Sequence, residues 1–176
     1  MNNRAFWRAC HALVHPVMIA AVVMLLFNDH WLRLTYPSWL TGKLGDWTWL
    51  MFAPLIAALP LAMLIPRRLH HQERIVGIIA FSFIGLWFAL AKTVPVAHLL
   101  TTSLLDAIVG WKGTLRLDPT DLFMLPALLP AWMIWRQAKN TEPELSPGVW
   151  TVLAMGIMGT LANSPSIRAF EGIETL

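Results

Sequence analysis

Long apolar runs separated by short polar segments dominate the chain. A bilayer core is about 30 Å thick and needs roughly 20 apolar residues in a helix, so each such run predicts a membrane-spanning helix. The pattern predicts about five spans, near His11–Phe27, Trp47–Ile65, Ile75–Ala91, Leu122–Trp135 and Val149–Asn163. The expected fold class is therefore all-α, a polytopic transmembrane helical bundle in which residues 1–176 form a single domain.

The stretch Val94–Gly110 is apolar but does not fit this pattern. Joined to the preceding span, it would give a helix of about 50 Å, which is too long for one crossing. Pro95 supplies a natural break. Beyond it, His98, Thr102 and Asp106 recur at every fourth residue and so share one helical face. We expect an interfacial or re-entrant helix here, with a sixth full span as the alternative.

Composition agrees with a membrane location. Hydrophobic residues make up 57% of the chain and charged residues 13%, which leaves too little polar surface to cover a soluble core. Many of the ten tryptophans flank apolar runs, where their amphipathic rings suit the headgroup layer. The lipid bilayer is therefore an expected partner. Nucleic acid is not, because the net charge of +3 comes from basic residues in short loops.

Charged residues in the loops predict the orientation of the bundle. With this set of spans, the side of the N-terminus carries seven basic residues and the other side six, while acidic residues divide three to seven. The basic residues of the first side are Arg4, Arg8, Arg67, Arg68, Arg74, Arg136 and Lys139. The positive-inside rule then predicts a cytoplasmic N-terminus and an acid-rich outer face. No small-residue cleavage site follows the first apolar run, so we expect it to be an uncleaved span.

Polar residues gather in the segments assigned to the outer face. Charged groups near hydrocarbon are costly, so they tend to be paired or functional. Lysines would supply positive charge, aspartates would supply carboxylates, and a histidine would be able to titrate. The candidate ligand- or ion-binding residues are Asp29, His30, Lys43, Asp46, Lys92, Asp118 and Asp121. Such a set is able to bind a polar ligand, hold a divalent cation or relay protons.

A purely structural role is the alternative for each of these residues. Asp118 or Thr120 can cap the fourth predicted helix, with Pro119 or Asp121 in its first turn, where a negative charge suits the helix dipole. Asp46 can cap the second predicted helix in the same way. The sequence assigns no catalytic residue, no cofactor and no metal ligands.

Several short strings of the sequence together resemble a known group of proteins. They are His15-Pro16, Asn28-Asp29-His30-Trp31-Leu32, Leu40-Thr41-Gly42-Lys43-Leu44-Gly45-Asp46 and Asp118-Pro119-Thr120-Asp121-Leu122. In these strings the chain is similar to an uncharacterised family of small bacterial multi-pass membrane proteins, and the resemblance covers roughly the first three-quarters of the chain. The resemblance implies a bacterial inner-membrane location and carries no activity. Gly45 is a departure, because the resemblance leads us to expect a small hydroxyl residue there.

Different classes of function remain open. The first is a small transporter, an ion-conducting unit or an accessory subunit bound to other membrane subunits, which the short loops and the prolines inside predicted spans favour. The second is a membrane-embedded hydrolase or transferase at the outer leaflet, whose carboxylates would act as acid and base or bind a metal. A metal-dependent enzyme would require several of the candidate carboxylates and histidines to converge. A structural or assembly role without a ligand is the third.

Overall fold

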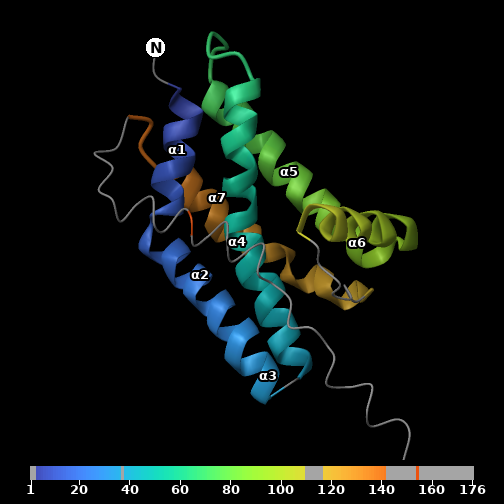
Figure 1. Cartoon of the computed structure of the whole chain (residues 1–176). Helices are drawn as coiled ribbons and strands as arrows, with labels where there is room; N and C mark the ends of the chain where they lie inside the picture. The colour runs from blue at the N-terminus through green and yellow to red at the C-terminus, as the bar shows by residue number, and fades with distance from the viewer. Residues whose placement is uncertain (1–2, 37, 110–116, 142–153, 155–176) are drawn as a thin grey trace, which may run out of the picture.

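The structure, a computed structural model, describes residues 3–36, 38–109, 117–141 and 154. Within these residues every regular element is helical. In chain order they are α1 (Arg4–Leu13), α2 (Pro16–Phe27), the π-helix η1 (Asn28–Leu32), α3 (Arg33–Thr35), α4 (Trp39–Leu64), α5 (Gln72–Thr93), α6 (Pro95–Val109), the 3-10 helix η2 (Pro119–Ala127) and α7 (Leu128–Gln137). Figure 1 shows α4 in the centre, with α1 and α2 on one side, α5 on the other and α7 behind.

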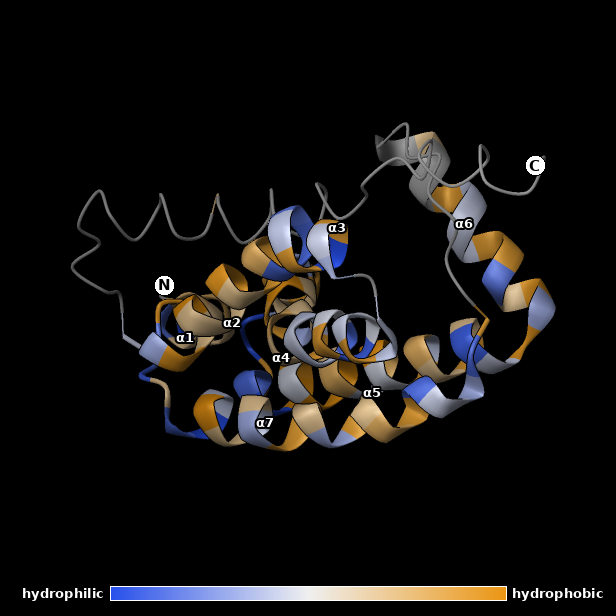
Figure 2. Ribbon diagram, turned by 90° about the horizontal axis from the view of Figure 1, so that it is seen from below, coloured by the Kyte–Doolittle hydropathy of each residue, from blue (hydrophilic) through white to orange (hydrophobic). Residues whose placement is uncertain are grey.

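Three helical segments in the described residues are long and apolar enough to cross a membrane, namely Pro16–Thr35, Trp39–Leu64 and Gln72–Thr93. Figure 2 shows hydrophobic residues along most of these helices. Large apolar side chains face outward from them, including Leu64, Phe83 and Leu86, which are 77%, 56% and 64% exposed. Contact of such apolar surfaces with lipid carries no free-energy cost, whereas their exposure to water is unfavourable. For the residues that the structure describes, the prediction of an all-helical fold with helices suited to a membrane is confirmed, and three of these segments are suited to cross it.

The first apolar run contains a break that moves the spanning segment toward the C-terminus. α1 ends at Leu13, and His15 adopts an extended conformation before Pro16, which is the first residue of α2. A residue that precedes proline is biased away from the helical region, and proline itself suits a helix start. The π-helix and α3 then prolong α2 as far as Thr35. The predicted span His11–Phe27 therefore began and ended too early.

The second long helix starts earlier than the apolar pattern predicted. Ser38 caps α4 by a capping box, in which the amide of Thr41 donates to Ser38 Oγ and the amide of Ser38 donates to Thr41 Oγ1. A serine that caps in this way satisfies orphan amides of the first helical turn. The predicted start at Trp47 and the predicted capping role of Asp46 are therefore wrong. Asp46 lies inside α4.

The break at Pro95 is confirmed. α5 ends at Thr93 and α6 begins at Pro95, after Val94 in an extended conformation. α6 contacts α5 and projects away from the rest of the bundle (Figures 1 and 2). Val96, Leu99 and Leu100 are more than half exposed on it.

The fourth predicted span, Leu122–Trp135, is divided in two. Pro119–Ala127 forms a 3-10 helix with Pro126 inside it, and only Leu128–Gln137 is α-helical. Proline removes a backbone donor and crowds the preceding turn, which disfavours a continuous α-helix here. The fifth predicted span, Val149–Asn163, lies outside the described residues except for residue 154.

Glycines let α5 approach the segment formed by η2 and α7. A Cβ atom at Gly77 would lie 2.4 Å from Nε1 of Trp135, which is almost fully buried, and one at Gly85 would lie 3.0 Å from Leu128 Cδ1. Small residues permit this close packing of membrane helices. The packing fixes η2 next to the C-terminal end of α5, where the candidate site lies.

Candidate functional site

A lysine on α4 begins the candidate site. Lys43 lies near the start of α4 and is only 4% exposed. Its Nζ donates to Thr120 Oγ1 at 2.6 Å, forms a buried ion pair with Asp121 Oδ1, and lies 3.6 Å from Asp118 Oδ2. All three partners are on η2 or its N-cap. Lys43 therefore joins α4 to η2.

A second lysine reaches the same carboxylate from α5. Lys92 lies in the last turn of α5, where a positive charge complements the helix dipole. Its Nζ is 2.6 Å from Asp121 Oδ2 and 2.9 Å from Asp46 Oδ2 on α4. Phe88, one turn earlier, places its ring 5.4 Å from the ammonium group. The Asp121 carboxylate is thus shared between Lys43 and Lys92.

The conformation of η2 positions the shared carboxylate. Asp118 is the N-cap, and its Oδ1 accepts from the amide of Thr120 at 2.9 Å and from the Thr120 hydroxyl at 2.7 Å. Pro119 occupies the first turn, and Asp121 follows in it with 6% exposure. The capping role predicted for Asp118 is therefore confirmed. The cap and the site coincide, because the turn that Asp118 fixes carries Asp121 toward the lysines.

We call this group of six residues the lysine–aspartate network. Its members are Lys43, Asp46, Lys92, Asp118, Thr120 and Asp121. The spacing of Lys43 and Asp46, three apart on a helix, places both on one face of α4. Formal charges of two lysines and three aspartates leave the network one unit negative. Lys43, Lys92 and Asp121 are buried, while Asp46 and Asp118 keep 24% and 22% of their side chains exposed.

Local hydrogen bonds shift the titration of the outer member of the network. The hydroxyl of Thr120, and then its amide, hold the pKa of Asp118 below its usual value of 3.8, and the charge of Lys43 acts in the same direction. Hydrogen bonds to the ionised form of a carboxyl group favour that form. Asp118 is therefore an anion over the whole neutral range.

A second polar contact lies where η1 packs against α4. Asn28 and Asp29 are buried in the π-helix, with 0% and 4% exposure. Nδ2 of Asn28 donates to Asp29 Oδ1 at 3.1 Å and to the carbonyl of Thr41 at 3.0 Å. A Cβ at Gly45 would lie 3.3 Å from Asn28 Nδ2, so the glycine makes room for this contact. The network and this contact sit on different faces of the same part of α4.

The structure therefore brings five of the seven candidate residues together and leaves two elsewhere. Lys43, Asp46, Lys92, Asp118 and Asp121 form one network, whereas Asp29 packs beside Gly45. His30 is exposed, with Nδ1 3.0 Å from the carbonyl of Leu26.

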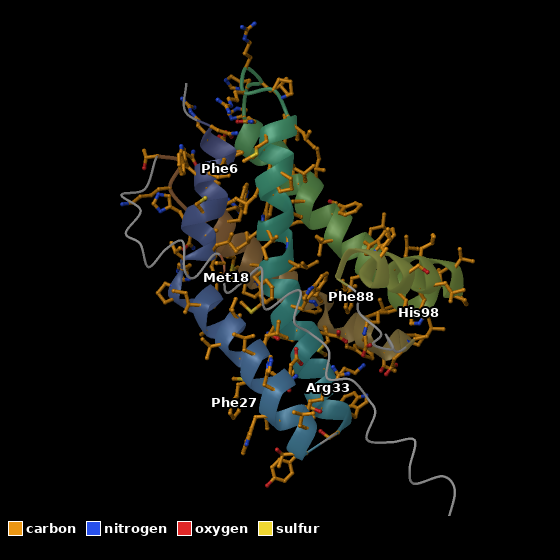
Figure 3. All side chains as sticks on the ribbon, viewed as in Figure 1. Phe6, Met18, Phe27, Arg33, Phe88 and His98 are labelled. Carbon is orange, nitrogen blue, oxygen red and sulfur yellow. The ribbon has the colours of Figure 1, made fainter. Side chains whose placement is uncertain are left out.

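His98 lies outside the network as well. Its Nδ1 is 3.3 Å from the carbonyl of Ala91, and Figure 3 shows the side chain out on α6. The side chain of Asp106 is not among those described. Neither His30 nor His98 therefore belongs to the network, although a titrating histidine was an expected part of the site.

Sequence reasoning missed three participants. Thr120 entered only as a possible cap, yet its hydroxyl accepts from Lys43. Asn28 and Thr41 were not singled out, although a buried asparagine and a carbonyl hydrogen-bond across two helices there. The only local signal for Thr120 was its place between two aspartates, and none marked Asn28 as a helical residue.

The described residues contain no group of three or more His, Cys, Asp or Glu side chains that could hold a metal ion. In the network the ammonium groups of Lys43 and Lys92 occupy the positions between carboxylates that a cation would otherwise take. The arrangement suits partner exchange among charged groups or a proton relay.

No family model matches the chain, and neither a curated protein nor a solved structure gave a match. The site must therefore be interpreted from its own chemistry.

Proposed function

We propose that the protein is a multi-pass membrane protein of the bacterial inner membrane, with about five spans, α6 at the interface and a cytoplasmic N-terminus. Three apolar helices of sufficient length and the apolar outer surface support the membrane location. Arg8 donates to Asn140, and residues 67–73 share a cavity with Arg4, so the basic segments assigned to the cytoplasm lie at one end. The resemblance to small bacterial multi-pass proteins points the same way.

In this membrane protein, the lysine–aspartate network serves as the polar site of a small transporter or ion-conducting unit, or of an accessory subunit in a larger membrane complex, on the extracytoplasmic face. The single observation that carries this proposal is the sharing of Lys92 between Asp46 and Asp121, at 2.9 and 2.6 Å. Ionisable residues at membrane depth are rare and mark ion pathways and proton relays. In the network, aspartates and lysines alternate along a chain of ion pairs that runs from Asp46 through Lys92, Asp121 and Lys43 to Asp118.

The sharing of Lys92 gives the network a way to accept a proton. If Asp46 takes a proton, Lys92 remains paired with Asp121, so no ammonium group is left alone in a buried position. Asp46 is also the part-exposed acceptor, while Asp121 is buried. Proton entry at Asp46 is therefore the least costly step, and the proton is the ion that we propose the site handles.

The proposal is tested with purified protein in liposomes that contain a pH-sensitive dye, under a potassium diffusion potential. We expect proton flux above that of empty liposomes, and a loss of about a hundredfold in Asp46→Asn, because a positioned proton-transfer group contributes a factor of this order or more. Asp118→Asn is the matched control, since Asp118 lies at the exposed edge, forms no ion pair with Lys92, and asparagine keeps a side-chain oxygen that caps η2. Flux equal to that of empty liposomes would contradict an ion-conducting role.

The orientation is tested separately with reporter fusions. A reporter placed after Arg68 is expected to be active in the cytoplasm, and one placed after Lys112 outside it. The opposite result would invert the topology.

A membrane-embedded hydrolase or transferase is less well supported. Such an enzyme would need a carboxylate directed at its substrate, but each aspartate of the network lies within 3.6 Å of a lysine ammonium group. Transport or ion conduction therefore remains the function that the geometry supports best.

A further inference from the structure

A second cluster of charged residues lies at the opposite end of the bundle from the network. An open cavity of about 440 Å³ is lined by the loop between α4 and α5, the start of α5 and the start of α1. Its charged lining comprises Arg4, Arg67, Arg68, His70, His71 and Glu73. The proposed transport function makes no use of this cavity.

The charge of the cavity is strongly positive. Among the described residues, its lining contains three guanidinium groups and two imidazoles but one carboxylate. That carboxylate, Glu73, also interacts electrostatically with Arg8 of α1, which lies outside the lining. Guanidinium groups donate paired hydrogen bonds in a planar arrangement that matches phosphate oxygens. The cavity is thus suited to an anion with several oxygens.

The backbone that carries these groups is held in place. Gln72 is buried, and its Nε2 donates to the carbonyls of Ala62 and Ile65 at 3.2 and 2.9 Å. Asn3 Nδ2 donates to the same Ala62 carbonyl at 2.7 Å. These bonds tie α1, the end of α4 and the start of α5 together, so the loop that carries Arg67 and Arg68 is held at both ends.

The start of α5 adds to the positive potential. His71 is the N-cap and has a left-handed backbone conformation with φ of 62°, and its side chain makes no capping hydrogen bond. The first amides of a helix carry partial positive charge and bind anions. In this turn the amides of Gln72 and Arg74 donate to the carbonyls of Leu69 and His71, and Glu73, between them in the chain, lines the cavity.

We propose that this cavity binds a phosphate group, supplied either by the headgroup of an anionic phospholipid or by a free phosphate. The lipid source agrees with the position of the cavity at the end of helices that are apolar enough to span a membrane. The inference is independent of the proposed transport function, because none of the network residues lines the cavity.

The test compares the full-length protein with two variants matched in charge. Arg67→Gln/Arg68→Gln removes two charges from the cavity, and Arg136→Gln/Lys139→Gln removes two exposed charges from the same predicted side but outside it. Each protein is placed in nanodiscs of phosphatidylcholine with a fixed fraction of phosphatidylglycerol, and the bound lipid is counted by native mass spectrometry. Inorganic phosphate is titrated into the detergent-solubilised protein in parallel. Arg4→Gln tests the cavity from a different helix.

We expect wild type and the Arg136/Lys139 variant to retain phosphatidylglycerol, and the Arg67/Arg68 variant to bind it more weakly by about tenfold or more. Arg4→Gln should show a smaller loss in the same direction. Retention of phosphatidylglycerol that inorganic phosphate does not displace would identify the lipid as the source, and saturable phosphate binding that displaces it would identify free phosphate. Equal losses in the two double variants, or no binding of either ligand by wild type, would overturn the proposal.

Discussion

The Nζ atom of Lys92 lies 2.6 Å from Oδ2 of Asp121, although the two residues belong to different helices separated by a long stretch of chain. The other oxygen of the same carboxylate is bound by Lys43 of α4. One aspartate therefore joins three helical elements, namely α4, α5 and η2. Because Asp121 is buried, removal of its charge leaves two ammonium groups short of a partner.

The Asp121→Asn substitution should lower the free energy of unfolding by about 3 kcal/mol, since both buried ammonium groups lose their nearest carboxylate and keep only a part-exposed one. Thermal unfolding in detergent, followed by tryptophan fluorescence, measures the change. Asp118→Asn removes a carboxylate at the exposed edge and should cost clearly less. Equal effects of the two substitutions would show that Asp121 has no special place in the network.

Lys92 and Asp46 should be energetically coupled. Lys92→Met alone leaves Asp46 without its ion-pair partner at 2.9 Å, whereas Lys92→Met/Asp46→Asn removes both charges. The double variant should therefore be more stable than the sum of the single effects predicts, by about 1 kcal/mol, which lies within the usual range for contacting residues. A double-mutant cycle on unfolding free energies gives this coupling. A value near zero would mean that the two groups do not interact in the folded protein.

Gly77 should not tolerate even one additional methyl group. A Cβ there would meet Trp135 Nε1 at 2.4 Å and Trp132 Cζ3 at 3.0 Å, so α5 and α7 would have to separate. We expect Gly77→Ala to destabilise the protein by about 2 kcal/mol through overpacking. Gly42→Ala is the control, because no atom lies within 4 Å of its added Cβ. In that helical position, alanine should stabilise the protein by about 0.5 kcal/mol.

Gly45 should accept serine but not leucine. A Cβ at this position lies 3.3 Å from Asn28 Nδ2 and 3.8 Å from Asp29 Oδ1, which leaves room for a small polar group only. Gly45→Leu should cost about 2 kcal/mol, because a bulky side chain forces η1 away from α4. Gly45→Ser should leave the melting temperature nearly unchanged. Equal melting temperatures for the serine and leucine variants would contradict the close packing of η1.

Acid should weaken the cap that Asp118 forms. The pKa of Asp118 is lower in the folded protein than its usual value of 3.8, so its contribution to stability is present above that value. The contribution is lost as the pH falls through the folded pKa, when the carboxyl group becomes protonated. Asp118→Ser keeps a capping oxygen without this titration. The difference in melting temperature between wild type and the serine variant should therefore shrink as the pH falls below the usual value of 3.8, and a constant difference would contradict the prediction.

Local patterns predicted the parts of this fold that depend on local chemistry. The apolar runs indicated membrane helices, Pro95 indicated the break after α5, and Asp118 indicated the start of η2. Each of these depends on one segment and its neighbours, such as a missing donor or a side chain that caps the next turn.

Errors occurred where a distant contact or an alternative cap prevailed. Asp46 is a candidate cap because apolar residues follow it, but Ser38 forms a capping box, so α4 begins before Asp46 and contains it. The first predicted span ends at Phe27, yet Asn28 and Asp29 continue the helix as a π-helix against Gly45. A buried partner on another helix satisfies polar groups that would otherwise favour a turn.

The sequence by itself determined that the chain is apolar, helical and suited to a membrane, because hydropathy and proline act within a single segment. It also placed the charged residues near helix ends, but it left open whether each was a cap or part of a site. Only the tertiary structure decided that Lys43, Lys92 and Asp121 meet. The reason is that glycines on α5 allow α7 to pack closely against it. Because η2 leads directly into α7, this packing brings charges from α4, α5 and η2 into one buried network.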